Sequence, residues 1–201
     1  MISHQYRCIF IHQRKAAGSA IIRSFGITPQ QPEWHTFNEG VLGPEWANKD
    51  SLAPGYRTFI VIRNPWDRVI SGWRYLDACR HRPLREVLQD LPQEGHDYRH
   101  LTRPQLDTVL EAGGRFAPDY VLRYEHLARD YARLCRIIGK RAWWPHLPRV
   151  NTTRHRPYQE YYDAETIEMV RTLFRKYIEF FGYDFGNGAL NLDNLRGKLL
   201  A

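Results

Sequence analysis

The sequence has 201 residues, 43% of them hydrophobic and 25% charged, a balance that excludes a disordered or fibrous chain and suits one globular domain with a sizeable core. No stretch approaches about 18 consecutive apolar residues and the N-terminus has no apolar signal core, which argues against a membrane span or a secretory leader. Lys and Arg outnumber Asp and Glu by 29 to 22, giving a net charge of +7, so an anionic partner such as a nucleotide, nucleic acid or acidic glycan is favoured.

The three cysteines, Cys8, Cys79 and Cys135, form an odd set without metal-ligand spacing. Each lies in an apolar or helical context, which predicts buried, reduced thiols. Reduced thiols suit a reducing compartment, so the sequence predicts a cytoplasmic, bacterial-type enzyme.

Three short runs rich in β-branched and apolar residues are each followed by a helical pattern. The run TFIVIR (residues 58–63) is continuously apolar up to its last residue, as in a strand buried on both faces of a parallel sheet. Alternation of strands with helices predicts an α/β fold with a parallel sheet. The expected strands are Arg7–His12, Thr58–Arg63 and Tyr120–Tyr124, and the expected helices are Ala17–Phe25, Pro65–Cys79 and His126–Ile138.

The apolar spacing in the C-terminal part of the sequence predicts one long helix, which begins after the N-cap Asp163 and ends at Gly182. The segment Pro83–Pro118 is polar and is expected to be irregular. We therefore expect a single domain over residues 1–185, followed by a tail, residues 186–201, with the potential for a short helix.

The loop HQRKAAGS (residues 12–19) lies between the first expected strand and the first expected helix. Backbone N–H groups at such a junction bind anions, Gly18 permits close approach, Ser19 adds a hydroxyl and Lys15 a positive charge. In the usual nucleoside-triphosphate loop, Gly-x-x-x-x-Gly-Lys-Ser/Thr, the lysine follows the second glycine. Here Lys15 precedes Gly18 and no glycine opens the loop, so the type of anion is left open by this segment alone.

A second anion site is indicated by IVIRNPWDRVISGWRY (residues 60–75). Arg63 ends a strand, and Ser71 lies eight residues further, two turns into the next helix, so the two can share one oxyanion. The alternative is that Arg63 pairs with a carboxylate and Ser71 only packs.

The two segments together resemble the cofactor-binding motifs of PAPS-dependent sulfotransferases, closest to the carbohydrate (Golgi type 2-like) family and its bacterial members. In that family a Pro-Lys-Thr-Ala-Gly-Ser loop holds the 5′-phosphosulfate and an Arg-x-Pro-x-x-Arg-x-x-Ser stretch holds the 3′-phosphate. Further similar segments are WHT (34–36), DYVLRYEHLARDY (119–131) and LPRVNTTRHRPYQEYYDAETIEMV (147–170), in the same order. The resemblance implies a P-loop-like three-layer fold with a central parallel sheet flanked by helices.

The resemblance also implies residue roles in sulfuryl transfer from PAPS to an acceptor hydroxyl. Lys15 is the catalytic cation that neutralises the leaving phosphate of PAP. His35 is the expected general base, with His12 as the alternative. The cofactor-binding residues implied are Arg14, Ala17, Gly18, Ser19, Ala20, Arg63, Ser71, Tyr124 and Arg154. For the basic loop around Arg154, ordinary surface charge is an equal alternative. Arg14 and Ala16 replace the family's proline and threonine, and the lost hydroxyl weakens one phosphate contact.

The implied acceptor is a carbohydrate, although a small hydroxylated metabolite suits so compact a chain equally well. No essential metal is expected, because no acidic residue is paired with a hydroxyl-bearing loop residue in the manner of a Mg²⁺ site. Two other classes stay open: a P-loop kinase, which would need a Gly-Lys-Ser/Thr loop and a metal-holding acid, and a basic nucleic-acid-binding module. The oligomeric state is left open.

Overall fold

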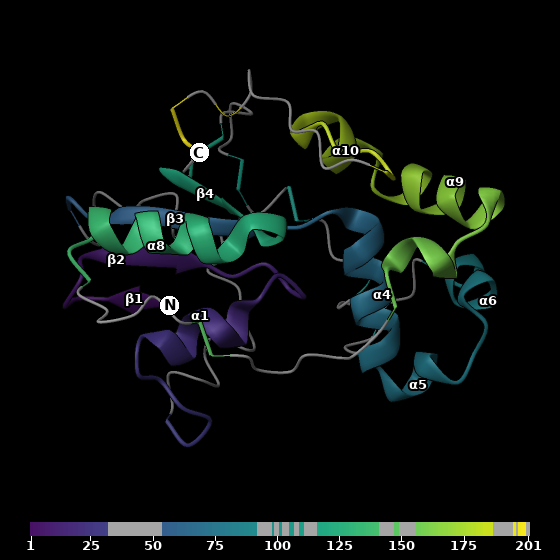
Figure 1. Cartoon of the computed structure of the whole chain (residues 1–201), viewed down its shortest axis with the longest axis horizontal. Helices are drawn as coiled ribbons and strands as arrows, with labels where there is room; N and C mark the ends of the chain where they lie inside the picture. The colour runs from purple at the N-terminus through teal and green to yellow at the C-terminus, as the bar shows by residue number, and fades with distance from the viewer. Residues whose placement is uncertain are drawn as a thin grey trace. The chain divides into compact units, whose positions relative to one another are not determined.

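The computed structural model describes residues 1–31, 54–91, 98, 101, 105–106, 109–110, 116–140, 147–148, 156–186, 195 and 197–199. The contacts divide the chain into two compact units. Unit 1 comprises Met1–Ile62, Asp107–Asn151 and Leu195–Ala201, and unit 2 comprises Arg63–Leu106 and Thr152–Asn194. Figure 1 labels their helices and strands. The single domain over residues 1–185 stays a prediction.

Unit 1 contains a four-stranded sheet in the order β1-β2-β3-β4. Strands β2 (Cys8–Ile11), β3 (Arg57–Ile62) and β4 (Tyr120–Arg123) are parallel neighbours, and β1 (Ile2–Ser3) pairs antiparallel with β2. All four residues of β2 and five of the six in β3 are buried, because a parallel sheet is covered on both faces. The α/β class and the three expected strands are therefore confirmed, whereas β1 was not predicted.

One face of this sheet is covered by α1 (Gly18–Ser24) and α8 (Leu127–Ile137), and Figure 1 shows α8 lying over the strands. Alternate strand residues point toward these two helices and form one core cluster with them. The cluster includes Phe10, Phe59 and Leu122 from the strands and Ile21, Ile22, Tyr131 and Leu134 from the helices. The hydroxyls of Ser24 and Tyr131, 2.5 Å apart, join the two helices. A short 3₁₀ turn, η2 (Tyr124–His126), connects β4 to α8.

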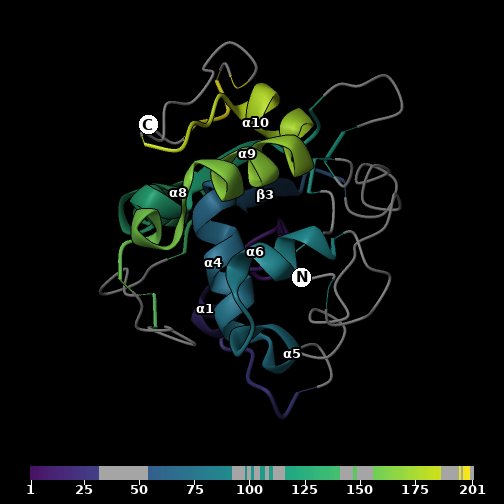
Figure 2. The ribbon, with the colours of Figure 1, turned by 90° about the vertical axis from the view of Figure 1, so that its right-hand side faces the viewer.

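Unit 2 is helical in its described part, with α4 (Pro65–Tyr75), α5 (Asp77–Arg80), α6 (Leu84–Gln89), η3 (Tyr158–Tyr161), α9 (Ala164–Leu173) and α10 (Arg175–Phe181). Figure 2 shows this set of helices face on. The start of α4 is as predicted, because the Asn64 side chain caps it and Pro65 occupies its first turn. Asp163 caps α9 in a capping box with Thr166, and Gly182 ends α10 at a left-handed φ of 69°.

Two of the expected helices are each divided in two. The helix expected over Pro65–Cys79 breaks at Leu76, whose ψ of 124° is extended, and its side chain is 5% exposed. The helix expected between Asp163 and Gly182 breaks at Phe174, where φ is −112° and ψ is 24°. The Arg68 guanidinium carbon lies 4.5 Å from the centroid of the Phe174 ring, in a cation–π contact.

The segment Pro83–Pro118, expected to be irregular, contains α6, whose Leu84, Val87 and Leu88 are buried. In the C-terminal tail, Leu199 forms a parallel bridge with Val121, and the Lys198 ammonium donates to the carbonyl oxygens of Phe116 and Pro118. The described part of the tail therefore lies beside β4, and most of residues 186–201 lie outside the described part.

All three cysteines are free and buried, as expected. Burial raises the pKa of the Cys8 thiol to about 12, and it also raises the pKa of Cys135. Among the described helices, none has the length and apolar character needed to cross a membrane.

Candidate functional site

The Lys15 loop runs from the end of β2 to the start of α1. Most of it is enclosed: Gln13, Arg14 and Ala16 are at most 8% exposed, whereas Lys15 is half-buried. The backbone N–H groups of Gly18 and Ser19 have no backbone carbonyl acceptor in the described part of the chain. Loop N–H groups and a lysine ammonium are together the donors that an anion needs.

This loop carries backbone strain at two residues other than glycine. Lys15 and Ala17 have φ values of 64° and 58°, in the left-handed region. Each such residue costs about 1–2 kcal/mol, because its Cβ approaches the following carbonyl oxygen. Gly18, predicted to permit close approach of the backbone to a ligand, is not among the glycines of positive φ. Strain that the rest of the fold maintains is typical of ligand-binding loops, where it orients N–H groups for binding.

Tyr124 lies at the same edge of the sheet as this loop. It follows β4 directly, as the Lys15 loop follows β2, and both strands pair in parallel with β3. Since neighbouring strands are about 4.8 Å apart, the two loops start about 10 Å from each other, a span that a nucleotide can bridge. Ligands of parallel sheets bind outside the carboxyl ends of the strands, which is where these residues lie.

A buried ion pair fixes the chain on either side of Tyr124. Asp130 of α8 is fully buried, and its Oδ2 accepts hydrogen bonds from the Arg123 backbone N–H at 3.0 Å and from Arg123 Nε at 2.9 Å. Its Oδ1 accepts from Arg123 Nη2 at 3.0 Å. Burial by itself would raise the pKa of Asp130, but these bonds outweigh it, so its pKa lies below the usual value. Asp130 was not predicted, because no spacing rule relates a strand residue to an acid in the next helix.

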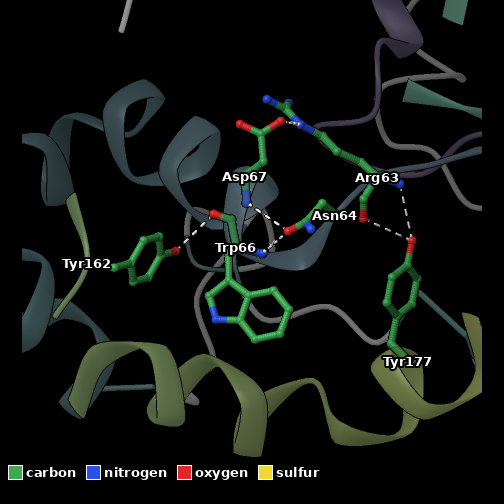
Figure 3. A network of polar contacts seen from close by, with 6 residues as sticks. All are labelled: Arg63, Asn64, Trp66, Asp67, Tyr162 and Tyr177. Atoms are coloured by element: carbon green, nitrogen blue, oxygen red, sulfur yellow. Dashed lines mark hydrogen bonds and ion pairs between the residues drawn. The ribbon is translucent and has the colours of Figure 1, made fainter. Parts of the chain in front are cut away.

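Arg63 and Ser71 belong to unit 2, with Arg63 following β3 directly and Ser71 lying in α4. Figure 3 shows the Arg63 guanidinium beside the first turn of α4, where its Nε donates to Asp67 Oδ2 at 2.8 Å. Asp67 and Ser71 are four residues apart and therefore share one face of the helix. The structure thus brings Arg63 to the face of α4 that carries Ser71, and Arg63 also has the carboxylate partner that the alternative interpretation anticipated.

The backbone of Arg63 is fixed by Tyr177 of α10. The Tyr177 hydroxyl lies 3.3 Å from both the N–H and the carbonyl oxygen of Arg63. Asn64 Oδ1 accepts from the Trp66 N–H at 3.0 Å, and Asn64 Nδ2 donates to the Asp184 carbonyl at 2.9 Å (Figure 3 shows the first of these). Arg63 is consequently held on its backbone and on its side chain, which pre-organises it for an anion.

Arg68 is a second buried cation in unit 2. It is 1% exposed, its Nη2 lies 3.4 Å from the Leu101 carbonyl oxygen, and its Nε and Nη1 have no hydrogen-bond partner among the described residues. Burial, and to a lesser extent the nearby positive charge of Arg63, lowers its pKa to about 10. Tyr162 is also buried, and its burial raises the pKa of its hydroxyl, which donates to the Trp66 carbonyl oxygen at 2.9 Å.

The predicted site residues fall into three groups. Lys15, Arg14, Ala17, Gly18, Ser19, Ala20 and Tyr124 belong to unit 1, where the loop and Tyr124 share one sheet edge. Arg63 and Ser71 belong to unit 2, where they share one helix face. His35 and Arg154 lie outside the described residues, whereas His12, the alternative base, is half-buried directly after β2.

Comparison with protein-family models, with curated proteins and with solved structures gives no match to this chain. Among the described residues, no group of three or more His, Cys, Asp or Glu side chains is arranged to hold a metal ion.

Proposed function

We propose that this chain is a sulfotransferase that transfers the sulfuryl group of PAPS to an acceptor hydroxyl. The observation that carries the proposal is the strained Lys15 loop at the carboxyl edge of a parallel sheet. The loop offers backbone N–H groups and one ammonium, and its lysine precedes the glycine, as in the phosphosulfate loop that the sequence resembles. In the same proposal, the sheet and its helices form a three-layer, P-loop-like fold.

The 5′-phosphosulfate is assigned to the Lys15 loop. The N–H groups of residues 17–20, with the hydroxyl of Ser19, bind its oxygens, and Arg14 adds positive charge. Ala16 is fully buried and has no hydroxyl, so the backbone must supply what the family's threonine supplies. Arg14 is 8% exposed, and its charge therefore acts in a poorly hydrated environment, where Coulombic attraction for phosphate is stronger than in water.

The 3′-phosphate is assigned to Arg63 and Ser71. The guanidinium of Arg63, whose Nε donates to Asp67 Oδ2, is assigned to the phosphate as a charged donor. Asp67 thereby orients the guanidinium, although its charge opposes that of the phosphate. Tyr124 is assigned to the adenine, and Arg154 to the nucleotide.

The reaction is an in-line displacement at sulfur. The acceptor oxygen forms a bond to sulfur while the bond between sulfur and the bridging phosphate oxygen breaks, and PAP leaves with the bonding electron pair. Lys15 stabilises the negative charge that develops on the bridging oxygen, and His35 takes the proton of the acceptor hydroxyl, with His12 as the alternative base. The acceptor class is a carbohydrate or a small hydroxylated metabolite, and the proposed location is the cytoplasm.

The first test is binding of PAP, measured as a shift of the melting temperature. At a PAP concentration about 100 times Kd, stabilisation of about 2.7 kcal/mol raises Tm by about 5–10 °C. Adenosine 5′-monophosphate, which lacks the 3′-phosphate, should give a smaller shift. Arg63→Gln should abolish the difference between the two nucleotides, and the matched variant Arg74→Gln, on the exposed part of α4, should preserve it. The absence of any shift with saturating PAP would reject the proposal.

The second test is turnover with labelled PAPS and a panel of hydroxylated acceptors. Lys15→Ala should lower kcat by orders of magnitude while the variant still binds PAP. His35→Ala should lower the rate and remove its dependence on pH between about 6 and 8, the range in which histidine titrates. Turnover that requires ATP and is lost in EDTA would instead indicate the kinase, and steeply salt-dependent binding of DNA or RNA without PAP binding would indicate the nucleic-acid module.

A further inference from the structure

The excess of positive over negative charge lies in one of the two units. In the sequence, unit 1 comprises sixteen Lys or Arg and nine Asp or Glu, an excess of seven positive charges. Unit 2 comprises thirteen Lys or Arg and thirteen Asp or Glu. The excess positive charge therefore belongs to the unit that contains the sheet and α8.

Three of these charges lie in one row along α8. Arg129, Arg133 and Arg136 follow the spacing i, i+4, i+7, so they occupy one narrow arc of the helix and extend for about 10 Å along it. The opposite side of α8 is buried on the sheet through Tyr131 and Leu134. Arg129 and Arg136 are exposed and Arg133 is half-buried. We refer to these three arginines as the basic face.

The basic face is only slightly neutralised. Asp130, the one acid of α8, is turned inward and is bound by Arg123 through three hydrogen bonds, and Arg129 Nε lies 3.4 Å from its Oδ1. Arg133 and Arg136 form no ion pair with any residue that the structure describes. Two guanidinium groups in one row thus have no carboxylate partner within the described part of the chain.

The side chains around the basic face narrow the choice of partner. Ala128 and Ala132 lie beside the arginines, and Ile137, next to Arg136, is an exposed large apolar residue at 42%. Between Leu127 and Ile137 this face of α8 has no amide side chain and no exposed aromatic ring, and the exposed His126 lies at the N-cap of the helix. An arginine row with a neighbouring exposed isoleucine fits an anionic lipid surface, where guanidinium groups bind lipid phosphates and the apolar side chain enters the acyl boundary.

We propose that the basic face of α8, with Ile137, docks unit 1 on an anionic lipid surface. The docking is peripheral, and it involves the outer side of a helix whose inner side belongs to the core. It does not depend on sulfuryl transfer, because none of the four residues is assigned to the cofactor or the acceptor. Each basic residue near an anionic surface contributes about a factor of five to partitioning, so the three arginines together account for a change of about 100-fold.

The experiment is co-sedimentation of the full chain with vesicles of phosphatidylcholine containing phosphatidylglycerol, and with vesicles of phosphatidylcholine alone, at low and high salt. The wild-type chain should bind the anionic vesicles only, and salt should release it. The triple variant Arg129→Gln/Arg133→Gln/Arg136→Gln should lower the partition coefficient by about 100-fold. The triple substitution to lysine, which keeps the charge, should restore most of the binding.

A charge-matched control is available in unit 2. Arg74, Arg175 and Lys176 are exposed, and their triple substitution by glutamine removes the same net charge from elsewhere in the chain. If this control weakens vesicle binding as much as the α8 variant does, the effect is one of net charge and the proposal is wrong. Circular dichroism of each variant before sedimentation checks that the helix content of the chain is unchanged, and glutamine is chosen because it sustains helices well.

Ile137→Ser distinguishes a lipid surface from a soluble polyanion. It should reduce binding to anionic vesicles while leaving unchanged any binding to polyuridylic acid or heparin, which have no apolar layer. Binding to one of these soluble polymers through the three arginines, with no binding to vesicles at low salt, would overturn the proposal in favour of a soluble partner.

Discussion

The buried ion pair between Arg123 and Asp130 allows the most quantitative test of the structure. Asp130→Asn keeps the size of the side chain but removes its charge and replaces one acceptor oxygen by an NH₂ group. Arg123, whose side chain is 13% exposed, then faces a donor in place of an acceptor and has lost the partner of its charge. Removing one partner of a buried pair costs about 3 kcal/mol or more, because the remaining charge is poorly hydrated.

For a chain of this length, 3 kcal/mol corresponds to a decrease of Tm by about 10 °C. Urea unfolding followed by circular dichroism measures the same loss as a lower midpoint with unchanged slope. Asp77→Asn is the matched control, because Asp77 is 84% exposed and pairs with Arg80 at the surface, where an ion pair contributes little. The double variant Arg123→Met/Asp130→Leu should recover part of the stability, since two apolar residues replace both charges while the Arg123 backbone N–H loses its acceptor.

The dependence on pH provides a separate check. Burial raises the pKa of Asp130 and the hydrogen bonds from Arg123 lower it by more, so the folded-state pKa lies below the unfolded-state value of about 3.9. The stabilisation by the carboxylate is therefore fully present above the unfolded pKa and is lost as the pH falls through the folded pKa. The difference in unfolding free energy between wild type and Asp130→Asn should accordingly shrink in acid. A difference below about 1 kcal/mol at neutral pH, where about 3 kcal/mol is expected, would refute this account of the ion pair.

Three further predictions concern stability and reactivity. Asn64→Ala should lower the unfolding free energy by about 1 kcal/mol, because the first turn of α4 loses its cap, and an unchanged urea midpoint would contradict this. Ala17→Gly should raise it by about 0.5–1 kcal/mol, since glycine relieves the strain at a φ of 58°, whereas a loss of stability would mean that the loop is not strained. Native Cys8, Cys79 and Cys135 should resist a thiol reagent at pH 8 and react after addition of guanidinium chloride, because all three are buried and the pKa of Cys8 is about 12; rapid labelling of the native chain would contradict this burial.

The sequence predicts the strands of unit 1 better than the breaks between the helices of unit 2. Arg57–Ile62 is recognisable because a strand buried on both faces must be continuously apolar. The short edge strand Ile2–Ser3 has too few residues to show any periodicity. The breaks at Leu76 and Phe174 are likewise invisible in the sequence, because both residues are apolar at helical spacing and it is tertiary packing that turns them out of the helix.

The candidate site was predictable as two segments. Lys15 and Arg63 were recognised because each follows a buried strand, the position at which parallel sheets bind ligands. The partners that hold these segments could not be predicted from spacing. Tyr177 reaches Arg63 from 114 residues away, and Asp130 reaches Arg123 from the next helix. The left-handed conformations of Lys15 and Ala17 could not be predicted either, because neither residue type favours a positive φ.

The excess positive charge of unit 1 also bears on how this unit folds. Seven excess positive charges within unit 1 repel one another, and this repulsion opposes the compact state of unit 1 but not that of the electrically balanced unit 2. Added salt screens the repulsion, so the amide hydrogens of β2, β3 and α8 should exchange more slowly as salt rises, while those of α9 stay unchanged. The ionic strength of the surroundings would then regulate the rigidity of one half of the molecule and leave the other half as it is.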